Sequence, residues 1–381
     1  MKTMTKSILI AGVMMTAGLA MAAPKAAETK EAKAKPRIEV CFVLDTTGSM
    51  GGLIEGAKQK IWSIANEMAS AKPTPELRLG VVAFRDRGDD YVTKDFDLTN
   101  DIDAIYGQLQ SFQAAGGGDT PESVNEALDD AVRKMSWSPD KGVLKIIFLV
   151  GDAPPHMDYA NGPKYPDVCR EAVKRDLIIN TVQCGTLAET TPIWREIAEK
   201  AEGSYAAIAQ SGNMTAIVTP MDKELAELNR KLGTTLLAYG GERAHQIVAA
   251  KQAAAEAAPA PVAADRLSFN ARYGVAVQGE GELLDSLSSG KVKMESLKKD
   301  QLPAELQKMD DKELKAAIEA KQKERAELQT QIQKLSQERE KFLAEERKRL
   351  AESGKGDSFD EKVAASIRTE AARKGIVYEI K

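Results

Sequence analysis

The sequence predicts an α/β fold: a doubly wound, mostly parallel six-stranded sheet with one antiparallel edge strand, followed by a C-terminal α-helical or coiled-coil extension. Short apolar runs alternate with helical stretches between residues 37 and 231, which is typical of βα units. Two of the runs, Val40–Leu44 and Ile146–Val150, are wholly apolar, as central strands are when helices cover both faces. The third observation is a long charged stretch at residues 312–350 with a sparse apolar heptad pattern.

The first 22 residues have the pattern of a secretory signal. Lys2 and Lys6 supply the positive end, residues 8–20 the apolar core, and Ala20-Met21-Ala22 a small-x-small cleavage site. The apolar core is short for a membrane span, which needs about 20 residues. We therefore expect a periplasmic or secreted protein, which would contact a membrane only through an uncleaved signal.

The net charge bears on whether the protein binds nucleic acid, and the cysteines bear on whether it contains a disulfide bond. The net charge is -4 and no basic stripe stands out, which argues against a nucleic-acid partner. Of the three cysteines, Cys41 lies mid-strand and is expected to be a buried thiol. Cys169 and Cys184 either form a disulfide or stay as free buried thiols, and the sequence leaves both open.

The domain predicted at residues 37–231 follows a flexible Ala/Lys/Glu-rich leader at residues 23–36. Its expected strands are Ile38–Leu44, Leu77–Arg85, Tyr91–Leu98, Leu144–Val150, Ile178–Cys184 and Tyr205–Ala209. Its expected helices are Ile54–Ala71, Asp101–Gln110, Ser123–Met135, Tyr165–Arg175, Pro192–Ala201 and Asn213–Arg230. Asp86–Asp90 is a hairpin-length turn between the second and third strands, so one edge strand is expected to be antiparallel.

A first oxygen-rich loop follows the first strand. Asp45 supplies a carboxylate, Thr47 and Ser49 supply hydroxyls, and Gly48 permits a tight turn. In open α/β sheets ligands bind at the carboxyl ends of the strands. This set of hard oxygen donors suits Mg²⁺ or Mn²⁺ better than zinc or copper.

Two further loops have similar chemistry. The loop at residues 116–122 offers Asp119 and Thr120 just before a helix, where either one could equally serve as a helix cap. Asp152 follows the apolar strand Ile146–Val150, which places a second carboxylate at the same sheet edge as Asp45. Two such carboxylates repel each other unless a cation lies between them.

These three loops together resemble the metal-ion-dependent adhesion site of von Willebrand factor type A domains. Asp45-x-Thr47-x-Ser49 matches the first element of that site, and the DTTGSM, GGGDTPE and DAPPH stretches are similar to one branch of the family. The resemblance implies that Asp119 or Thr120 supplies a third contact and that Asp152 acts through water. It also implies a bound Mg²⁺, or Mn²⁺ or Ca²⁺, whose open position takes an Asp or Glu from a protein partner.

Two alternatives to this binding module are a metal-dependent hydrolase or phosphatase that uses the same aspartates, and a scaffold that acts through its helical arm. A phosphoaspartate enzyme would need a second Asp where Thr47 stands. The chain has two histidines, His156 and His245, and Lys58 is one residue out of register with a phosphate-binding loop. The sequence therefore favours binding over catalysis.

The region after the domain is expected to be less regular. Residues 232–241 are expected to pack back on the domain, residues 251–265 to form an Ala/Pro linker, and residues 266–300 to form a small β element. Residues 301–350 are expected to form a long charged helix or coiled coil that could self-associate through 312–350. The tail at residues 351–381 is expected to be a helix followed by a strand.

Overall fold

The computed structural model describes residues 35–214, 216–353 and 359–378. These residues belong to one compact unit that begins at Lys35. The predicted signal at residues 1–22 and residues 23–34 of the predicted leader lie outside the described residues.

A six-stranded sheet forms the centre of the fold and has the order β3-β2-β1-β4-β5-β6. All neighbouring strands are parallel except β2 and β3, which are antiparallel. This confirms the predicted fold class and the antiparallel edge. The strands are β1 (Arg37–Asp45), β2 (Glu76–Phe84), β3 (Thr93–Thr99), β4 (Leu144–Gly151), β5 (Ile178–Cys184) and β6 (Tyr205–Ile208).

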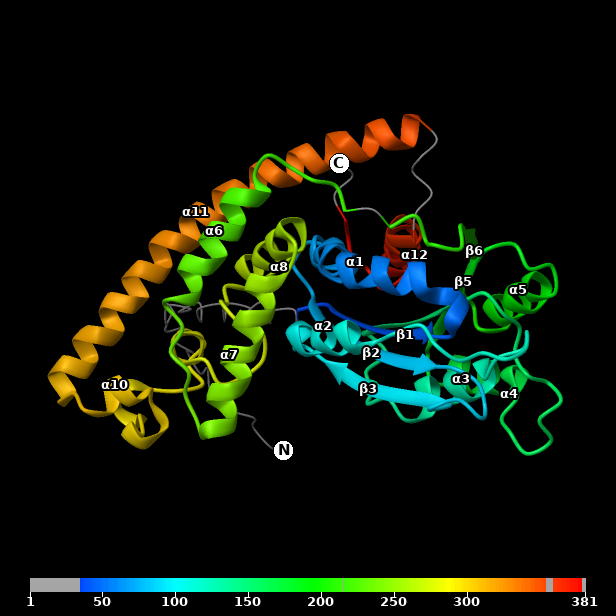
Figure 1. The fold of residues 1–381 in the computed structure, drawn as a ribbon, viewed down its shortest axis with the longest axis horizontal. Helices are drawn as coiled ribbons and strands as arrows, with labels where there is room; N and C mark the ends of the chain where they lie inside the picture. The colour runs from blue at the N-terminus through cyan, green and yellow to red at the C-terminus, as the bar shows by residue number, and fades with distance from the viewer. Residues whose placement is uncertain (1–34, 215, 354–358, 379–381) are drawn as a thin grey trace, which may run out of the picture. The chain divides into compact units, whose positions relative to one another are not determined.

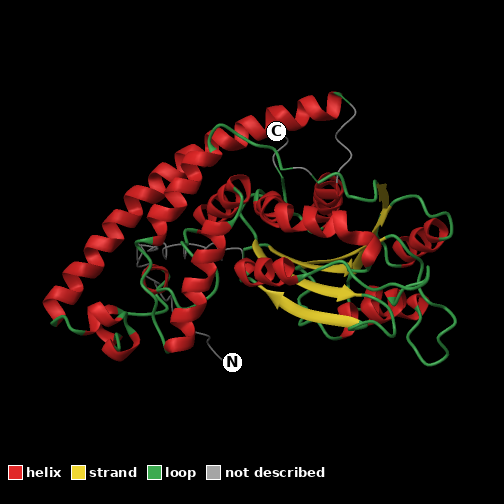
Figure 2. Cartoon of the chain, in the orientation of Figure 1, coloured by secondary structure: helices red, strands yellow, loops and turns green. Residues whose placement is uncertain are grey.

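Helices cover both faces of the sheet, as Figure 2 shows. On β1 the side chains alternate: Phe42 belongs to the core on one face, and Val43 to the core on the other. The first face is covered by α1 (Gly51–Ala69), α2 (Ile102–Ser111) and α12 (Phe359–Arg373). The second face is covered by α3 (Val124–Arg133), α4 (Tyr165–Lys174) and α5 (Thr190–Lys200).

All three cysteines are buried free thiols. Cys169 and Cys184 are not bonded because they belong to the cores on opposite faces of the sheet. Of the two alternatives that the sequence left open, the structure therefore has the free thiols.

The region after β6 is helical where the sequence predicted a linker and a β element. Its helices are α6 (Asp222–Gly233), α7 (Glu242–Ala257), α8 (Ala260–Tyr273), α9 (Leu283–Ser288), α10 (Ala304–Gln307) and α11 (Asp311–Glu352). The described residues also include short 3₁₀ helices at Gly48–Met50, Met294–Ser296 and Lys299–Gln301.

The physical reasons for these differences are local. Alanine has the highest helix propensity, and the prolines at 259 and 261 stand at the N-cap and in the first turn of α8, where the chain tolerates them. The helix expected from Asn213 begins only at Asp222, because residues before Pro220 are biased away from helical backbone.

The long charged segment forms one continuous helix, α11, which packs against α6 and α8 within the same chain (Figure 1). Leu328 and Ile332 of its apolar seam are buried against these two helices, and Leu314 and Ile318 are buried in a second cluster with Leu283 and Leu302. The seam expected to pair with another helix therefore already has partners. Two arginines that interrupt the heptad pattern are themselves anchors. Arg325 pairs with Glu282 and Asp285, and Arg339 pairs with Asp222 and Asp265.

The last described residues return to the sheet domain. Phe359 of α12 contacts Phe42 with ring centroids 6.3 Å apart, and Val377 accepts a backbone hydrogen bond from Lys72. A single β-bridge therefore stands where the sequence predicted a strand, and residues 379–381 lie outside the described part. No helix in the described ranges is long and apolar enough to cross a membrane.

Candidate metal centre

Three loops meet at the carboxyl edge of the sheet. β1 and β4 are parallel neighbours in which Leu44 pairs with Val150, so Asp45 and Asp152 leave adjacent strands at the same level. The backbone N–H of Gly48 donates to Gly116 O, and that of Ala115 donates to Thr46 O. These bonds join the 116–122 loop to the first loop.

Asp45 is buried at the centre of this group. Its Oδ1 accepts hydrogen bonds from the backbone N–H (2.8 Å) and the hydroxyl (2.7 Å) of Thr47. Thr47 Oγ1 also lies 3.3 Å from Ser49 Oγ. Asp45 Oδ2 is buried without a hydrogen-bond partner. An unpaired buried carboxylate oxygen is costly, so this atom is free to bind a cation.

Asp152 reaches the same group from β4. Its Oδ2 accepts a 2.7 Å hydrogen bond from the side-chain amide of Gln210, which also lies 3.3 Å from Ser49 O. One nitrogen therefore contacts both the Asp152 carboxylate and the loop that carries Ser49. Gln210 lies on the segment after β6 and matches no part of the motif, so sequence reasoning missed it.

The 116–122 loop carries the two predicted donors at its surface and a further acid in a buried position. Asp119 and Thr120 are exposed, whereas Glu122 is buried and its Oε2 has no hydrogen-bond partner. A β-carbon added to Gly117 would meet Glu122 Oε1 at 2.8 Å and Thr47 Cβ at 3.1 Å, so the Glu122 carboxyl lies beside the first loop. Sequence reasoning placed Glu122 in the motif without assigning it a role.

Burial and neighbouring negative charge raise the pKa values of two acids in this group, Asp45 and Glu122. Burial raises the pKa of Asp45 to about 7, opposed by the hydrogen bonds from Thr47 and increased by the charge of Asp152. Burial also raises the pKa of Glu122 to about 9, with Asp45 and Asp86 adding to the shift. Neighbouring carboxylates that are buried together raise each other's pKa values unless a cation offsets their charge.

Arg85 holds the first loop in place without entering it. Its guanidinium donates to Thr46 O and to Gln113 O, and it stacks on the ring of Tyr91, whose hydroxyl lies 2.7 Å from Thr46 Oγ1. The backbone of the loop is therefore fixed by a buried cation whose own bonds are directed away from Asp45.

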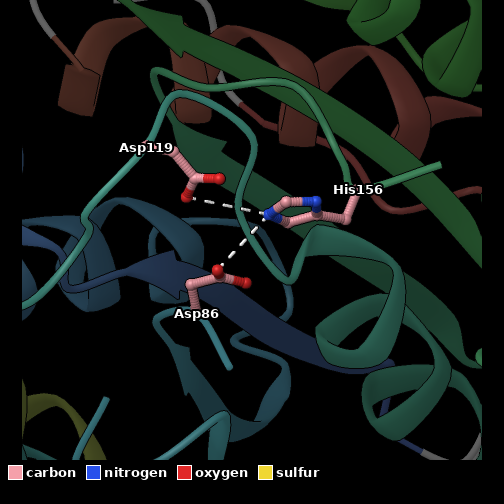
Figure 3. Close-up of side chains that lie close together, drawn as sticks. All are labelled: Asp86, Asp119 and His156. Carbon is pink, nitrogen blue, oxygen red and sulfur yellow. Dashed lines mark ion pairs between the residues drawn. The ribbon is translucent and has the colours of Figure 1, made fainter. Parts of the chain in front are cut away.

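A second group of ligand-type side chains lies where the 116–122 loop meets the segment after β4 (Figure 3). It consists of Asp86, Asp119 and His156, whose nearest ligand atoms lie within 4.8 Å of one another. Asp119 Oδ1 is 3.9 Å from His156 Nε2. The structure thus places Asp119 beside His156, a residue that the sequence analysis did not assign to a site.

The residues at Asp45 fit a hard divalent cation. Carboxylate and hydroxyl oxygens, two of them buried and unpaired, are the donors that Mg²⁺, Mn²⁺ and Ca²⁺ prefer. A cation at this place would give a partner to Asp45 Oδ2 and relieve the repulsion among the three acids.

Comparison with known proteins identifies the family of the sheet domain. A family model described as von Willebrand factor A domain matches residues 39–220. Residues 39–220 therefore form a von Willebrand factor A domain, and this chain is a protein that contains one.

The curated relatives match over part of their length. The chain is 36% identical over 120 residues to human von Willebrand factor A domain-containing protein 7, which is 32% of this chain and 12% of that protein. It is 22% identical over 158 residues to alpha-protein kinase vwkA of Dictyostelium discoideum, covering 40% of this chain and 24% of the kinase. The chain thus spans less than a quarter of either relative.

Solved structures show weaker likeness. An aerotolerance-related membrane protein from Bacteroides fragilis is 18% identical with a TM-score of 0.33, covering 46% of this chain and 92% of that one. Proximal thread matrix protein 1 from the mussel byssus is 16% identical with a TM-score of 0.36, covering 46% of this chain and 42% of that one.

Proposed function

We propose that this protein is a divalent-metal-dependent protein-binding module in which Mg²⁺, or Mn²⁺ or Ca²⁺, captures a carboxylate of a protein partner. Asp45, Thr47 and Ser49 hold the ion, and Asp152 acts on it through water. The 116–122 loop completes the shell through Thr120, one of its two donors predicted from sequence, or through the buried Glu122. The other predicted donor, Asp119, lies beside His156.

The observation that carries this proposal is the buried, unpaired Asp45 Oδ2 next to two hydroxyl groups. A shell that includes neutral hydroxyls leaves Mg²⁺ incompletely neutralised, so its remaining position attracts an acidic group from another molecule. Ser49 is exposed, which gives such a group access to the ion.

We further propose that the partner is a protein that presents an Asp or Glu in the periplasm or outside the cell. The signal-like pattern at residues 1–22 supports this location. The net charge of -4 argues against a nucleic-acid partner. Self-association through residues 312–350 would have to use the exposed face of α11, because its apolar seam is buried in the chain.

The first experiment tests the ion. A hundredfold excess of Mg²⁺ over its dissociation constant should stabilise the fold by about 2.7 kcal/mol, which for a compact unit of this size is roughly 4 °C in melting temperature. Asp45→Asn should abolish the shift, whereas Glu55→Gln, an exposed acid on α1, should keep it. A Mg²⁺ response of equal size in Asp45→Asn would exclude Asp45 as a ligand.

The second experiment separates the binding module from its alternatives. Immobilised protein should retain a cell-envelope partner with Mg²⁺ and release it with EDTA, and Asp45→Asn should not retain it. Capture that ignores both EDTA and Asp45→Asn would favour a scaffold acting through α11. Turnover of para-nitrophenyl phosphate that depends on Asp45 would favour the hydrolase.

A further inference from the structure

We propose that Asp86, Asp119 and His156 form a second divalent-metal site that takes a transition ion of the Zn²⁺ class. The site does not rest on the proposed function of the Asp45 centre. Its donor set is different, because it contains an imidazole nitrogen. Imidazole suits Zn²⁺ and related ions, whereas Mg²⁺ and Ca²⁺ prefer oxygen donors alone.

The unpaired atom at this site is His156 Nε2. The His156 side chain is 95% buried at 5% exposure, and Nε2 has no hydrogen-bond partner. It points at Asp86 Oδ2, 3.3 Å away, and at Asp119 Oδ1, 3.9 Å away (Figure 3). A cation between this ring nitrogen and the two carboxylates would give Nε2 a partner and offset the two negative charges.

The separations fit a metal shell. Zn–N and Zn–O bonds of roughly 2.0–2.2 Å place neighbouring tetrahedral ligands about 3.3–3.5 Å apart. The distance from His156 Nε2 to Asp86 Oδ2 already has that value. The three ligand atoms lie within 4.8 Å of one another, so Asp119 has to move inward to complete the shell. It is 62% exposed and lies in the glycine-rich loop, which permits that movement and leaves the ion an entry route.

The surroundings orient the ring as metal sites do. His156 Nδ1 lies 2.8 Å from Asp158 Oδ1, and a carboxylate on the second ring nitrogen fixes the tautomer that presents Nε2 to a metal. Tyr159 stacks on the imidazole at 4.0 Å and 12°. The backbone N–H of His156 also donates to Glu122 O.

Asp86 is equally fixed. Its Oδ1 accepts from Ser123 Oγ at 2.9 Å, and both of its oxygens lie 3.0 Å from the Tyr159 hydroxyl. The nearby Arg87 guanidinium stacks on the Tyr159 ring at 3.8 Å and pairs with Glu126, so its charge is partly neutralised. Two of the three ligands are therefore preorganised before an ion arrives.

This assignment also explains the position of Asp119. The sequence offered Asp119 or Thr120 to the first ion, and Asp119 instead lies beside His156. The 116–122 loop would then supply Glu122 to the first ion and Asp119 to the second.

The test uses the full ¹⁵N-labelled chain and the side-chain resonances of its two histidines. Zn²⁺ is added at pH 7.5 with Mg²⁺ in excess, so that the Asp45 centre is occupied. We expect the His156 Nε2 resonance to change as one equivalent binds. His245, whose Nε2 lies 3.0 Å from Gln301 O, serves as the internal reference and should not change.

Variants make the test specific to these residues. Asp119→Asn, at an exposed position, should weaken Zn²⁺ binding at least tenfold, and Asp158→Asn should weaken it about 10- to 100-fold. Asp90→Asn, at an exposed acid four residues after Asp86, should bind as the wild type does. Asp45→Asn should leave the His156 response unchanged.

Three outcomes would overturn the proposal. The first is a His156 resonance that responds to pH but not to Zn²⁺, since a proton would then be the cation at this place. The second is an equal change at both histidines, which indicates adventitious binding. The third is loss of the His156 response in Asp45→Asn, which would assign the ion to the first centre.

Discussion

The backbone of Gly151 lies directly against the side chain of Asp45. A β-carbon at position 151 would be 2.9 Å from Asp45 Cβ and 3.0 Å from Asp45 Oδ2. Because Thr47 holds the Asp45 carboxylate from the other side, the aspartate cannot move away without losing those hydrogen bonds. Asp45 can therefore keep this position only because residue 151 is a glycine and has no side chain.

We predict that Gly151→Ala weakens Mg²⁺ binding at least tenfold and destabilises the fold by about 1–3 kcal/mol, as overpacking of a buried site does. Metal titration followed by thermal shift, and urea unfolding, measure the two effects. Gly118→Ala is the control, because a β-carbon there meets nothing within 4 Å. If Gly151→Ala binds Mg²⁺ with wild-type affinity, Asp45 is not a ligand of the ion.

Glu122→Gln should have opposite effects with and without metal. The pKa of Glu122 is raised by burial from its usual value to about 9, so the metal-free fold loses stability as pH rises from about 4.5 through 9. Glutamine removes that loss, and we expect a more stable metal-free protein at pH 8. With Mg²⁺ the variant should bind about tenfold more weakly. Unchanged Mg²⁺ affinity would assign the third contact to Thr120.

Arg325→Met should destabilise the C-terminal region strongly. Arg325 lies between Glu282 and Asp285 and also donates to Thr235, and it is almost completely buried. Its removal leaves buried acids without a counter-charge, which costs about 3–5 kcal/mol. Urea unfolding measures the loss, and Lys323→Met, at an exposed position of α11, should cost little. Equal unfolding midpoints would mean that α11 is not anchored by this pair.

Glu370 on α12 should make the fold less stable at high pH. Burial raises the pKa of Glu370 to about 7, and the nearby Asn180 amide opposes part of the rise. The folded protein therefore holds a proton that the unfolded chain releases near pH 4.5, and stability falls by up to about 3 kcal/mol as pH rises from 4.5 through 7.

The measurement is the difference in urea midpoint between wild type and Glu370→Gln at pH 5 and pH 8. The variant should gain stability relative to wild type at pH 8 and lose the gain at pH 5. Glu352→Gln, an exposed acid at the end of α11, should follow the wild type at both values. A difference that does not depend on pH would contradict the assigned shift.

Deleting residues 359–381 should destabilise the von Willebrand factor A domain itself. Phe359, Val363 and Ile367 belong to the core on one face of the sheet, and each buried side chain of this size contributes about 1.5–3 kcal/mol. Circular dichroism and melting of the truncated chain measure the effect. A truncated domain that melts as the full chain does would show that α12 is dispensable.

Much of the sheet domain could be predicted because its signals are local. The apolar runs of β1 and β4 followed by Asp45 and Asp152 predict two buried strands with acids at one sheet edge. The hairpin-length turn after β2 likewise predicted the antiparallel edge. Each of these inferences needs a few consecutive residues and the period of a strand.

The rest depended on contacts between distant parts of the chain. Glu122 and His156 join their sites through a backbone bridge between two loops, and no local pattern reveals it. Arg325 and Arg339 interrupt a heptad in the sequence, yet both are buried because acids from α6, α8 and α9 surround them.

The sequence by itself therefore determined the sheet, its central strands and the oxygen-rich loop at Asp45, because strand period and loop composition are properties of neighbouring residues. Tertiary structure alone decided that Asp119 lies beside His156, that Glu122 is buried near Asp45, and that α12 completes the core. The physical reason is that a charged or apolar side chain finds its partner by burial against distant segments, and its own neighbours in sequence do not specify which segment that will be.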